Sequence, residues 1–460
     1  MSHIGTLAAL WKLPELPEAT LRCAILTGAE PVLPSSFAVG AAAQTSVSAA
    51  PLAAVKLGHV RGQPYQHVSV DMTHAALECS GWFSLDGVTP NAWDKFSGLY
   101  RCADGWVRIH ANFAHHRNGA LRLLGLPADT AKRVDAERAL LSWRALDFEQ
   151  AAADAGLVVA ACRSFAEWDV HPQGQAVAAL PLFTIERICD AEPRTLPALN
   201  ADDRPLAGLR VLDLTRILAG PVCGRLLAAY GADVMLINSP HLPNIESIAD
   251  TSRGKLSAHA NLRTSVGRDA LKSLLATSNV FVQGYRPGGL AALGFGPEDA
   301  ARMRPGIVYV SLSAYGDAGP WRARRGFDSL VQTATGFNLA EAQAANSPEP
   351  KPLPMQILDY ATGHLMAFAA TTALRRQALE GGSWHVKCSL AQTGQWLRGL
   401  GRVEKGFSIQ RPKVAPYIET APSGFGELAA LTHSAKFSRT PTRWVRPAMP
   451  PGTHPPLWPD

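Results

Sequence analysis

The chain has 460 residues, which is long enough for two domains that each bury a sizeable core. Its composition, 47% hydrophobic and 18% charged, is that of an ordinary globular protein and excludes the disordered and fibrous classes. The formal net charge is +6, but the basic residues are dispersed rather than gathered in a run. This pattern suits a polyphosphate small molecule better than a nucleic acid, so no nucleic-acid partner is expected.

Neither a disulfide framework nor a metal site is predicted. The seven cysteines are scattered and never form a CxxC pair. His110, His115 and His116 lack a carboxylate or cysteine at ligand spacing, so they are interpreted as surface or core residues. No stretch approaches roughly 18 uninterrupted apolar residues, and the first residues lack a basic segment followed by a long apolar one. No membrane association is therefore expected, and a cytoplasmic location is predicted.

The first half of the sequence predicts a small α+β domain. Residues 1–80 are expected to form helices and a short repeat that pack on a larger domain. The string GLYRCADGWVRIHA (98–111) predicts a hairpin that turns at Asp104-Gly105. Helical patterns follow at 118–124 and 137–155, so residues 81–191 are predicted to be the small domain with a return segment. Proline, aspartate and asparagine then cluster at 192–206, which indicates a linker.

Residues 207–400 alternate between short apolar runs and helical patterns, which is typical of βαβ units. Strands are expected at 209–214, 234–237, 280–283 and 307–312, and helices at 222–230, 268–277 and near 297–303. This α/β order predicts a Rossmann-like parallel sheet with helices on both faces. The glycine fingerprint of dinucleotide-binding folds is absent after the first strand, which argues against an NAD-dependent dehydrogenase. Residues 401–460 are predicted to form an extended tail.

An internal repeat relates residues 53–76 to residues 372–393. Each copy has a small-residue helix, a basic loop with glycine, a short strand and a second helix. Laid over each other, the copies place Asp359 opposite Val39, Gly40 or Ala41, so only the second copy has the acid. An aspartate before a helix is usually an N-cap, here of a helix expected at 361–377. The alternative role for Asp359 is that of a nucleophile.

The second half also contains six strings in this order: PLAGLRVLDLTRILAGPVCGRLLAAYGADVMLIN, RGKLSAHANLRT, VFVQGYRPGGLAALGF, VYVSLSAYGDAGPW, RGFDSLVQTATG and ILDYATGHLMA. In order and spacing they resemble the family III CoA-transferases, the CaiB/BaiF family, from residue 205 to about residue 389. The earlier strings GLYRCADGWVRIHANF and GLVVAACRSFAEWDVHPQ resemble later parts of an ordinary member. The halves are therefore expected to stand in circularly permuted order.

The resemblance implies an enzyme that moves CoA from an acyl-CoA donor to a small carboxylic acid. Asp359 would be the catalytic nucleophile, passing through a mixed anhydride and an aspartyl-CoA thioester. Coenzyme A would be a substrate, with no permanently bound cofactor and no metal, and the protein would be a homodimer. The residues that the resemblance assigns to CoA binding are Leu218, Ala219, Arg253, Lys255, Arg263, Gly284, Tyr285, Arg286 and Tyr315.

Two positions depart from the family pattern, because Leu218 stands in place of an amide and Ser239 in place of a basic residue. One alternative is an α-methylacyl-CoA racemase-like enzyme, which resembles the transferases but needs a histidine where this chain has Phe327. The other is a catalytically inactive CoA-binding subunit, against which the presence of Asp359 argues.

Overall fold

The computed structural model describes residues 3–459, and its centre is a seven-stranded sheet in the order β10-β9-β8-β11-β12-β13-β7. Only β7 runs antiparallel to its neighbour, at one edge. The predicted α/β class with a Rossmann-like parallel sheet is therefore confirmed. The strands are β7 (Phe183–Cys189), β8 (Arg210–Leu214), β9 (Asp233–Asn238), β10 (Lys255–His259), β11 (Val280–Gln283), β12 (Val308–Ser313) and β13 (Ser383–Ser389).

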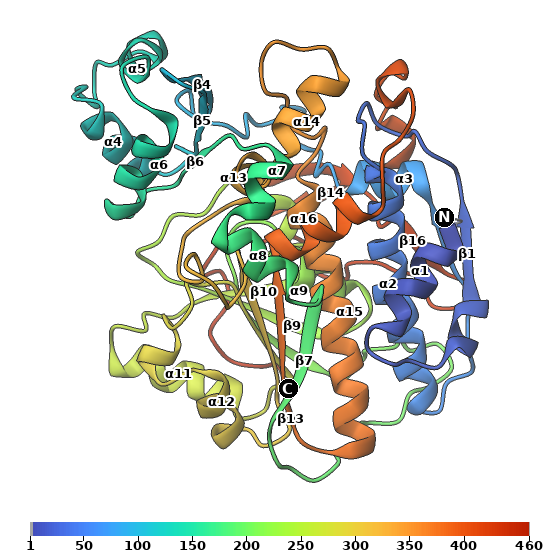
Figure 1. The fold of residues 1–460 in the computed structure, drawn as a ribbon. Coiled ribbons are helices and arrows are strands. Elements are labelled where there is room, and N and C mark those ends of the chain that lie inside the picture. The colour runs from blue at the N-terminus through green and yellow to red at the C-terminus, as the bar shows by residue number, and fades with distance from the viewer. Residues whose placement is uncertain (1–2, 460) are drawn as a thin grey trace.

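Helices cover both faces of this sheet (Figure 1). Helices α9 (Ala219–Ala229) and α15 (Ile357–Glu380) pack on one face, and α11 (Ser265–Leu275) and α12 (Pro297–Met303) pack on the other. Side chains of β11 alternate between the two cores, because successive residues of a strand point to opposite faces. Val280 and Val282 join the core with α9 and α15, whereas Phe281 packs with α11 and α12.

The internal repeat is also present in three dimensions. Helix α2 (Val39–Val60) packs against α15 and forms a further layer outside it (Figure 1). It is followed by β2 (Val68–Asp71) and α3 (Met72–Glu78), in the order in which β13 and α16 (Leu390–Gly399) follow α15. Both copies use the same cap: Asp71 Oδ1 accepts from the backbone N of His74 at 3.0 Å, and Ser389 Oγ accepts from that of Gln392 at 3.2 Å. This shared register places Asp359 opposite Ala41, the third residue of α2.

The C-terminal tail is more regular than expected. Strand β16 (Ala435–Phe437) pairs with β2, whose other neighbour is β1 (Ala24–Thr27). Strands β14 (Ile418–Ser423) and β15 (Gly426–Leu431) form a hairpin that continues into β3 (Phe83–Leu85). The tail thus contains paired strands: β15 and β16 find partners far away in the sequence, whereas β14 pairs with the adjacent β15.

The small domain has a core of its own. Its sheet contains β4 (Gly98–Arg101), β5 (Trp106–Ile109) and β6 (Val159–Ala161), so the hairpin at Asp104-Gly105 is confirmed. The helical run expected at 137–155 is two helices, because Asp104 Oδ1 accepts from the backbone N of Ala145 at 2.8 Å and fixes the start of the second one. The domain's helices are α4 (Ala114–Leu123), α5 (Arg133–Leu140) and α6 (Ala145–Asp154).

The remaining helices connect these parts. They are α1 (His3–Lys12), α7 (Phe165–Val170), α8 (Pro172–Ala178), α10 (Ile248–Thr251), α13 (Asp328–Ala334) and α14 (Phe337–Ala344), with 3-10 turns at Glu18–Cys23, Ala291–Leu293, Gly406–Ser408 and Ala415–Tyr417. Among residues 3–459, none of the helices combines the length and the apolar character needed to span a bilayer.

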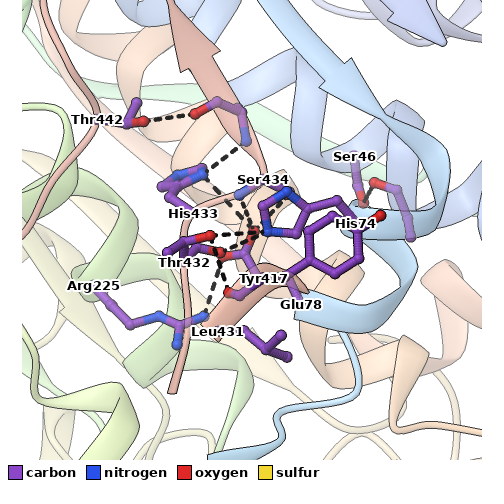
Figure 2. Close-up of polar contacts among 12 residues, drawn as sticks. Ser46, His74, Glu78, Arg225, Tyr417, Leu431, Thr432, His433, Ser434 and Thr442 are labelled. Atoms are coloured by element: carbon purple, nitrogen blue, oxygen red, sulfur yellow. Dashed lines mark hydrogen bonds and ion pairs between the residues drawn. The ribbon is translucent and has the colours of Figure 1, made fainter. Parts of the chain in front are cut away.

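A buried polar cluster around Glu78 joins the N-terminal repeat and the tail to the large domain (Figure 2). Glu78 Oε2 accepts from the backbone N and the Oγ of Ser434, at 2.8 and 2.6 Å. Arg225 Nη2 of α9 lies 3.5 Å from Glu78 Oε1, and the same guanidinium pairs with Asp250. His74 stacks on Tyr417 of the tail. A buried carboxylate and guanidinium that lose each other leave an uncompensated charge, so this cluster holds three distant segments together.

Candidate active site

A cavity of about 320 Å³ lies between the large and small domains. Its floor follows the carboxyl ends of β8, β11 and β12, where open α/β sheets usually bind ligands. The small domain contributes Phe113, His115 and His116, and α15 contributes Asp359. The cavity is therefore built from segments on both sides of the predicted linker.

Asp359 is 6% exposed and is the third residue of α15, whose N-cap is Gln356. Its carboxylate accepts a hydrogen bond from the backbone N–H of Ala219, the first residue of α9. The positive ends of two helices thus meet at this one acid. Gly363 permits the approach, because a Cβ there would lie 2.6 Å from the Ala219 carbonyl oxygen. The N-cap role considered from the sequence is wrong, because the helix begins two residues before Asp359.

A second carboxylate lies directly beside the first. Asp328 Oδ2 accepts from the backbone N of Asp359 at 2.9 Å, and Asp328 Oδ1 accepts from Gln332 Nε2. Burial raises the pKa of Asp359 well above the ordinary carboxyl value, and the charge of Asp328 raises it further. Burial also raises the pKa of Asp328, against the hydrogen bonds it accepts and the charge of Arg108. Two close buried carboxyls hold a proton between them more readily than isolated ones do.

Four arginines line the cavity around this acidic pair. Arg216 stacks on Phe113 and donates to the Pro243 carbonyl, so it connects the two domains. Arg286 is exposed in the turn after β11. The lining arginines are Arg216, Arg286, Arg324 and Arg325. Apolar side chains fill the space between them, so the cavity combines an apolar interior with several cations.

The structure brings together part of the predicted set. Five of the predicted CoA-binding residues line the cavity with Asp359, namely Leu218, Ala219, Gly284, Tyr285 and Arg286.

The other four predicted residues do not line this cavity. Lys255 is fully buried, with its Nζ 2.8 Å from Asp213 Oδ2 and 2.7 Å from the Pro221 carbonyl, so it supports the start of α9 from behind. Arg253 is buried against Trp444 and pairs with Asp250 and Glu419. Tyr315 is buried against Trp321, and Arg263 is exposed before α11. These environments leave Lys255, Arg253 and Tyr315 no open side for a ligand.

Sequence reasoning missed other residues that line the cavity. His115 and His116 were interpreted as surface or core residues, yet both line it. Burial and nearby cations lower the pKa of His116 to about 3, so its imidazole is neutral at pH 7. Arg324 and Arg325 were also missed, although the RGFD string contained a signal, because Arg325 lies three residues before Asp328. Among residues 3–459, no group of three His, Cys, Asp or Glu side chains is arranged to hold a metal ion.

Comparison with known proteins identifies the family that the chain resembles. Residues 206–413 match the family model of CoA-transferase family III. An acyl-CoA transferase of Gibberella moniliformis is 30% identical over 72% of this chain and 66% of its own length. The probable fatty acyl-CoA transferase Rv3272 of Mycobacterium tuberculosis is 34% identical over 39% of this chain and 48% of its own length. The chain belongs to CoA-transferase family III, the CaiB/BaiF family.

Two further matches each cover about half of this chain. The succinate–glutarate CoA-transferase of Agrobacterium fabrum is 29% identical over 51% of this chain and 65% of its own length. A crystal structure of a CaiB/BaiF family protein from Brucella suis is 28% identical, with a TM-score of 0.38 over 49% of this chain and 65% of that one. The chain thus spans about half to two thirds of the length of these relatives. The family model begins at residue 206, after the small domain, so the permuted order of the halves stays a prediction.

Proposed function

We propose that this protein transfers CoA from an acyl-CoA to a carboxylic acid, with Asp359 as the nucleophile. The observation that carries the proposal is the environment of Asp359, a buried carboxylate at two helix starts in a cavity lined by four arginines. Arginine side chains suit the diphosphate and 3′-phosphate of CoA. The apolar interior suits an acyl group, and coenzyme A is then a substrate and not a bound cofactor.

The chemistry divides into four displacements at carbonyl carbons. The Asp359 carboxylate attacks the thioester carbonyl and expels the CoA thiolate, which leaves an acyl-aspartyl anhydride. The thiolate then attacks the aspartyl carbonyl, releases the donor acid as a carboxylate and leaves an aspartyl-CoA thioester. The acceptor carboxylate repeats both steps in reverse, which restores Asp359. The Ala219 N–H, aimed at the carboxyl of Asp359, would stabilise the oxyanion formed when that carboxyl is attacked.

Intact-protein mass spectrometry tests this proposal. The wild-type protein is incubated with a panel of acyl-CoAs, without acceptor, and the adduct is located by peptide mapping. We expect a covalent CoA or acyl adduct at Asp359 and none in Asp359→Asn. CoA binding by calorimetry without any adduct would instead identify a CoA-binding subunit that lacks catalysis. The homodimer that the resemblance implies stays a prediction, which sedimentation velocity can test.

A second candidate function is favoured by one observation. The racemase-like alternative needs an imidazole together with the acid, and His116 lines the same cavity as Asp359 although Phe327 stands in the usual motif. A neutral imidazole is the form that can accept the α-proton of a 2-methylacyl-CoA, although the lowered pKa of His116 makes it a weak base. Incubation in D2O would then exchange that proton without acceptor acid, and His116→Gln would stop the exchange. Transfer of CoA without α-proton exchange would reject this candidate.

A further inference from the structure

A second cavity, of about 180 Å³, lies beside the first. The two share a wall at the carboxyl ends of β11 and β12, formed by Tyr285, Arg286, Pro287, Leu312 and Ser313. From this wall the second cavity extends toward β13 and the edge strand β7, where His385, Cys388 and Thr184 line it. A molecule held at Asp359 therefore has a neighbouring space along the same edge of the sheet.

The charged groups of the second cavity are already paired or neutral. Lys387 Nζ lies 2.8 Å from Glu186 Oε2 and 3.1 Å from Asp317 Oδ2. His385 Nε2 lies 2.8 Å from Ser311 Oγ, and burial lowers its pKa to about 4, so the ring is neutral. Arg286 stands only at the shared wall. An anionic group placed deep in this cavity would therefore meet no free cation among the lining residues.

The rest of the lining is mainly apolar. It includes Leu180, Leu290, Ala291, Pro297, Tyr309 and Cys388. Tyr309 offers its ring and not its hydroxyl, because that hydroxyl donates to the Phe295 carbonyl at 2.9 Å. An apolar group gains free energy by leaving water for such a surface, and a charged group does not.

We propose that the second cavity binds the hydrocarbon chain of the acyl group whose thioester lies at Asp359. This inference rests on the proposed transferase function and adds the substrate class, an acyl chain without a distal charge. The first cavity then contains the lining arginines and the reacting carboxyl of Asp359. The acyl chain passes along Leu312 and Ser313 from the first cavity into the second. Dicarboxylic donors such as short diacids are disfavoured, because their second carboxylate would be desolvated without a partner.

The experiment compares straight-chain acyl-CoAs from acetyl to octanoyl with one acceptor acid. We expect kcat/KM to rise about fourfold for each methylene, the ratio that corresponds to burial of one CH₂, until the cavity is full. Ala291→Trp fills the second cavity from its exposed rim without touching Asp359. It should abolish the dependence on chain length, with the largest loss of kcat/KM for octanoyl-CoA and the smallest for acetyl-CoA.

The matched control is Leu293→Trp, which lies in the same 3-10 turn and is 42% exposed but does not line the cavity. It should keep the wild-type chain-length dependence, and Ala291→Phe provides a smaller blocking side chain if the tryptophan lowers stability. Transfer that is independent of chain length in the wild type overturns the inference and leaves the transferase function intact. An equal loss for all chain lengths in Ala291→Trp also overturns it, because the cavity would then hold a part common to every CoA ester. No transfer with any acyl-CoA refutes the proposed function itself.

Discussion

The carboxylate of Asp359 does not cap its own helix, and its removal should therefore affect chemistry more than folding. Asp359→Asn keeps the shape of the side chain and removes a buried carboxyl whose ionisation is disfavoured by Asp328. We expect covalent labelling by acyl-CoA to fall at least about 100-fold, because a neutral amide does not act as the nucleophile. Thermal unfolding should show a midpoint equal to or above that of the wild type. Labelling that survives in Asp359→Asn would place the nucleophile elsewhere.

Asp328 should control the pH at which Asp359 becomes reactive. The pKa of each carboxyl is raised by burial, and the charge of Asp328 raises that of Asp359. Asp328→Asn removes this charge, so the rise of the labelling rate with pH should move to lower pH. The matched control is Asp317→Asn, an exposed carboxylate that pairs with Lys387 and leaves the acidic pair intact. A pH profile that is the same in Asp328→Asn and the wild type would contradict the coupling.

The sequence predicted the acid but only part of its surroundings. Asp359, Tyr285 and Arg286 were found because short motifs mark them. Lys255 and Arg253 were misplaced because basic residues at the start of a strand, here β10, carry no sign of which side they face. In the structure both satisfy buried carboxylates, Asp213 and Asp250. A cation beside a βα turn can bond to buried carboxylates and carbonyls of the protein as readily as it can bind a phosphate.

At the level of elements, the contact between α9 and α15 sets the geometry of the nucleophile. Gly363→Ala would place a Cβ 2.6 Å from the Ala219 oxygen and 2.8 Å from Val222 side-chain atoms. The start of α9 must then move away from Asp359 and weaken the hydrogen bond from Ala219. We expect the labelling rate to fall by about tenfold or more, the loss that a lengthened oxyanion contact would cause.

Gly399→Ala is the matched control for this change. It also replaces a helical glycine, at the end of α16, but its Cβ would meet nothing within 4 Å. Labelling and stability should remain at the wild-type level or rise slightly, since alanine favours helix more than glycine. A Gly363→Ala protein with the wild-type labelling rate would show that α9 does not need this close approach.

Elements were predictable where local periodicity was strong. The apolar runs of β8, β9, β11 and β12 and the proline-started α12 were all anticipated. Strand β10 (KLSAH) was not, because its lysine and serine look polar although Lys255 and Ser257 are buried. The strands of the tail were missed for another reason. Strands β15 and β16 pair with β3 and β2, hundreds of residues earlier, and no local pattern encodes such pairing.

At the scale of the whole molecule, segments far apart in the sequence meet at the cavity. The small domain precedes the linker and the large sheet follows it, yet both meet over Asp359. The first copy of the repeat lacks the acid, and the backbone N of Ala41, which corresponds to that of Asp359, donates to Glu30 Oε1 at 2.8 Å. Glu30 therefore accepts at the start of α2 the same backbone hydrogen bond that Asp328 accepts at the start of α15. We therefore expect the first copy to contribute packing and not a second site.

Histidines that are buried in the neutral form should make the whole molecule sensitive to acid. Burial lowers the pKa of each, to about 3 for three of them and about 4 for the other two; they are His110, His116, His364, His385 and His433. In the unfolded chain histidine titrates near ~6.5, so below that pH the unfolded state binds more protons. The free energy of unfolding must therefore fall as the pH falls from about 6.5 to about 4. The raised pKa values of four carboxyls, Glu30, Asp328, Glu341 and Asp359, act in the opposite direction, but the five histidines outnumber them.

Urea unfolding at pH 7 and pH 5 tests this expectation, and the midpoint should be clearly lower at pH 5. His364→Leu identifies one contributor, because both ring nitrogens of His364 are buried without a hydrogen-bond partner and a leucine cannot titrate. The variant should weaken the dependence of the free energy of unfolding on pH by up to about 1.4 kcal/mol per pH unit, the contribution of one titrating group. If the wild type were as stable at pH 5 as at pH 7, its histidines would have to be protonated in the fold, which their burial opposes.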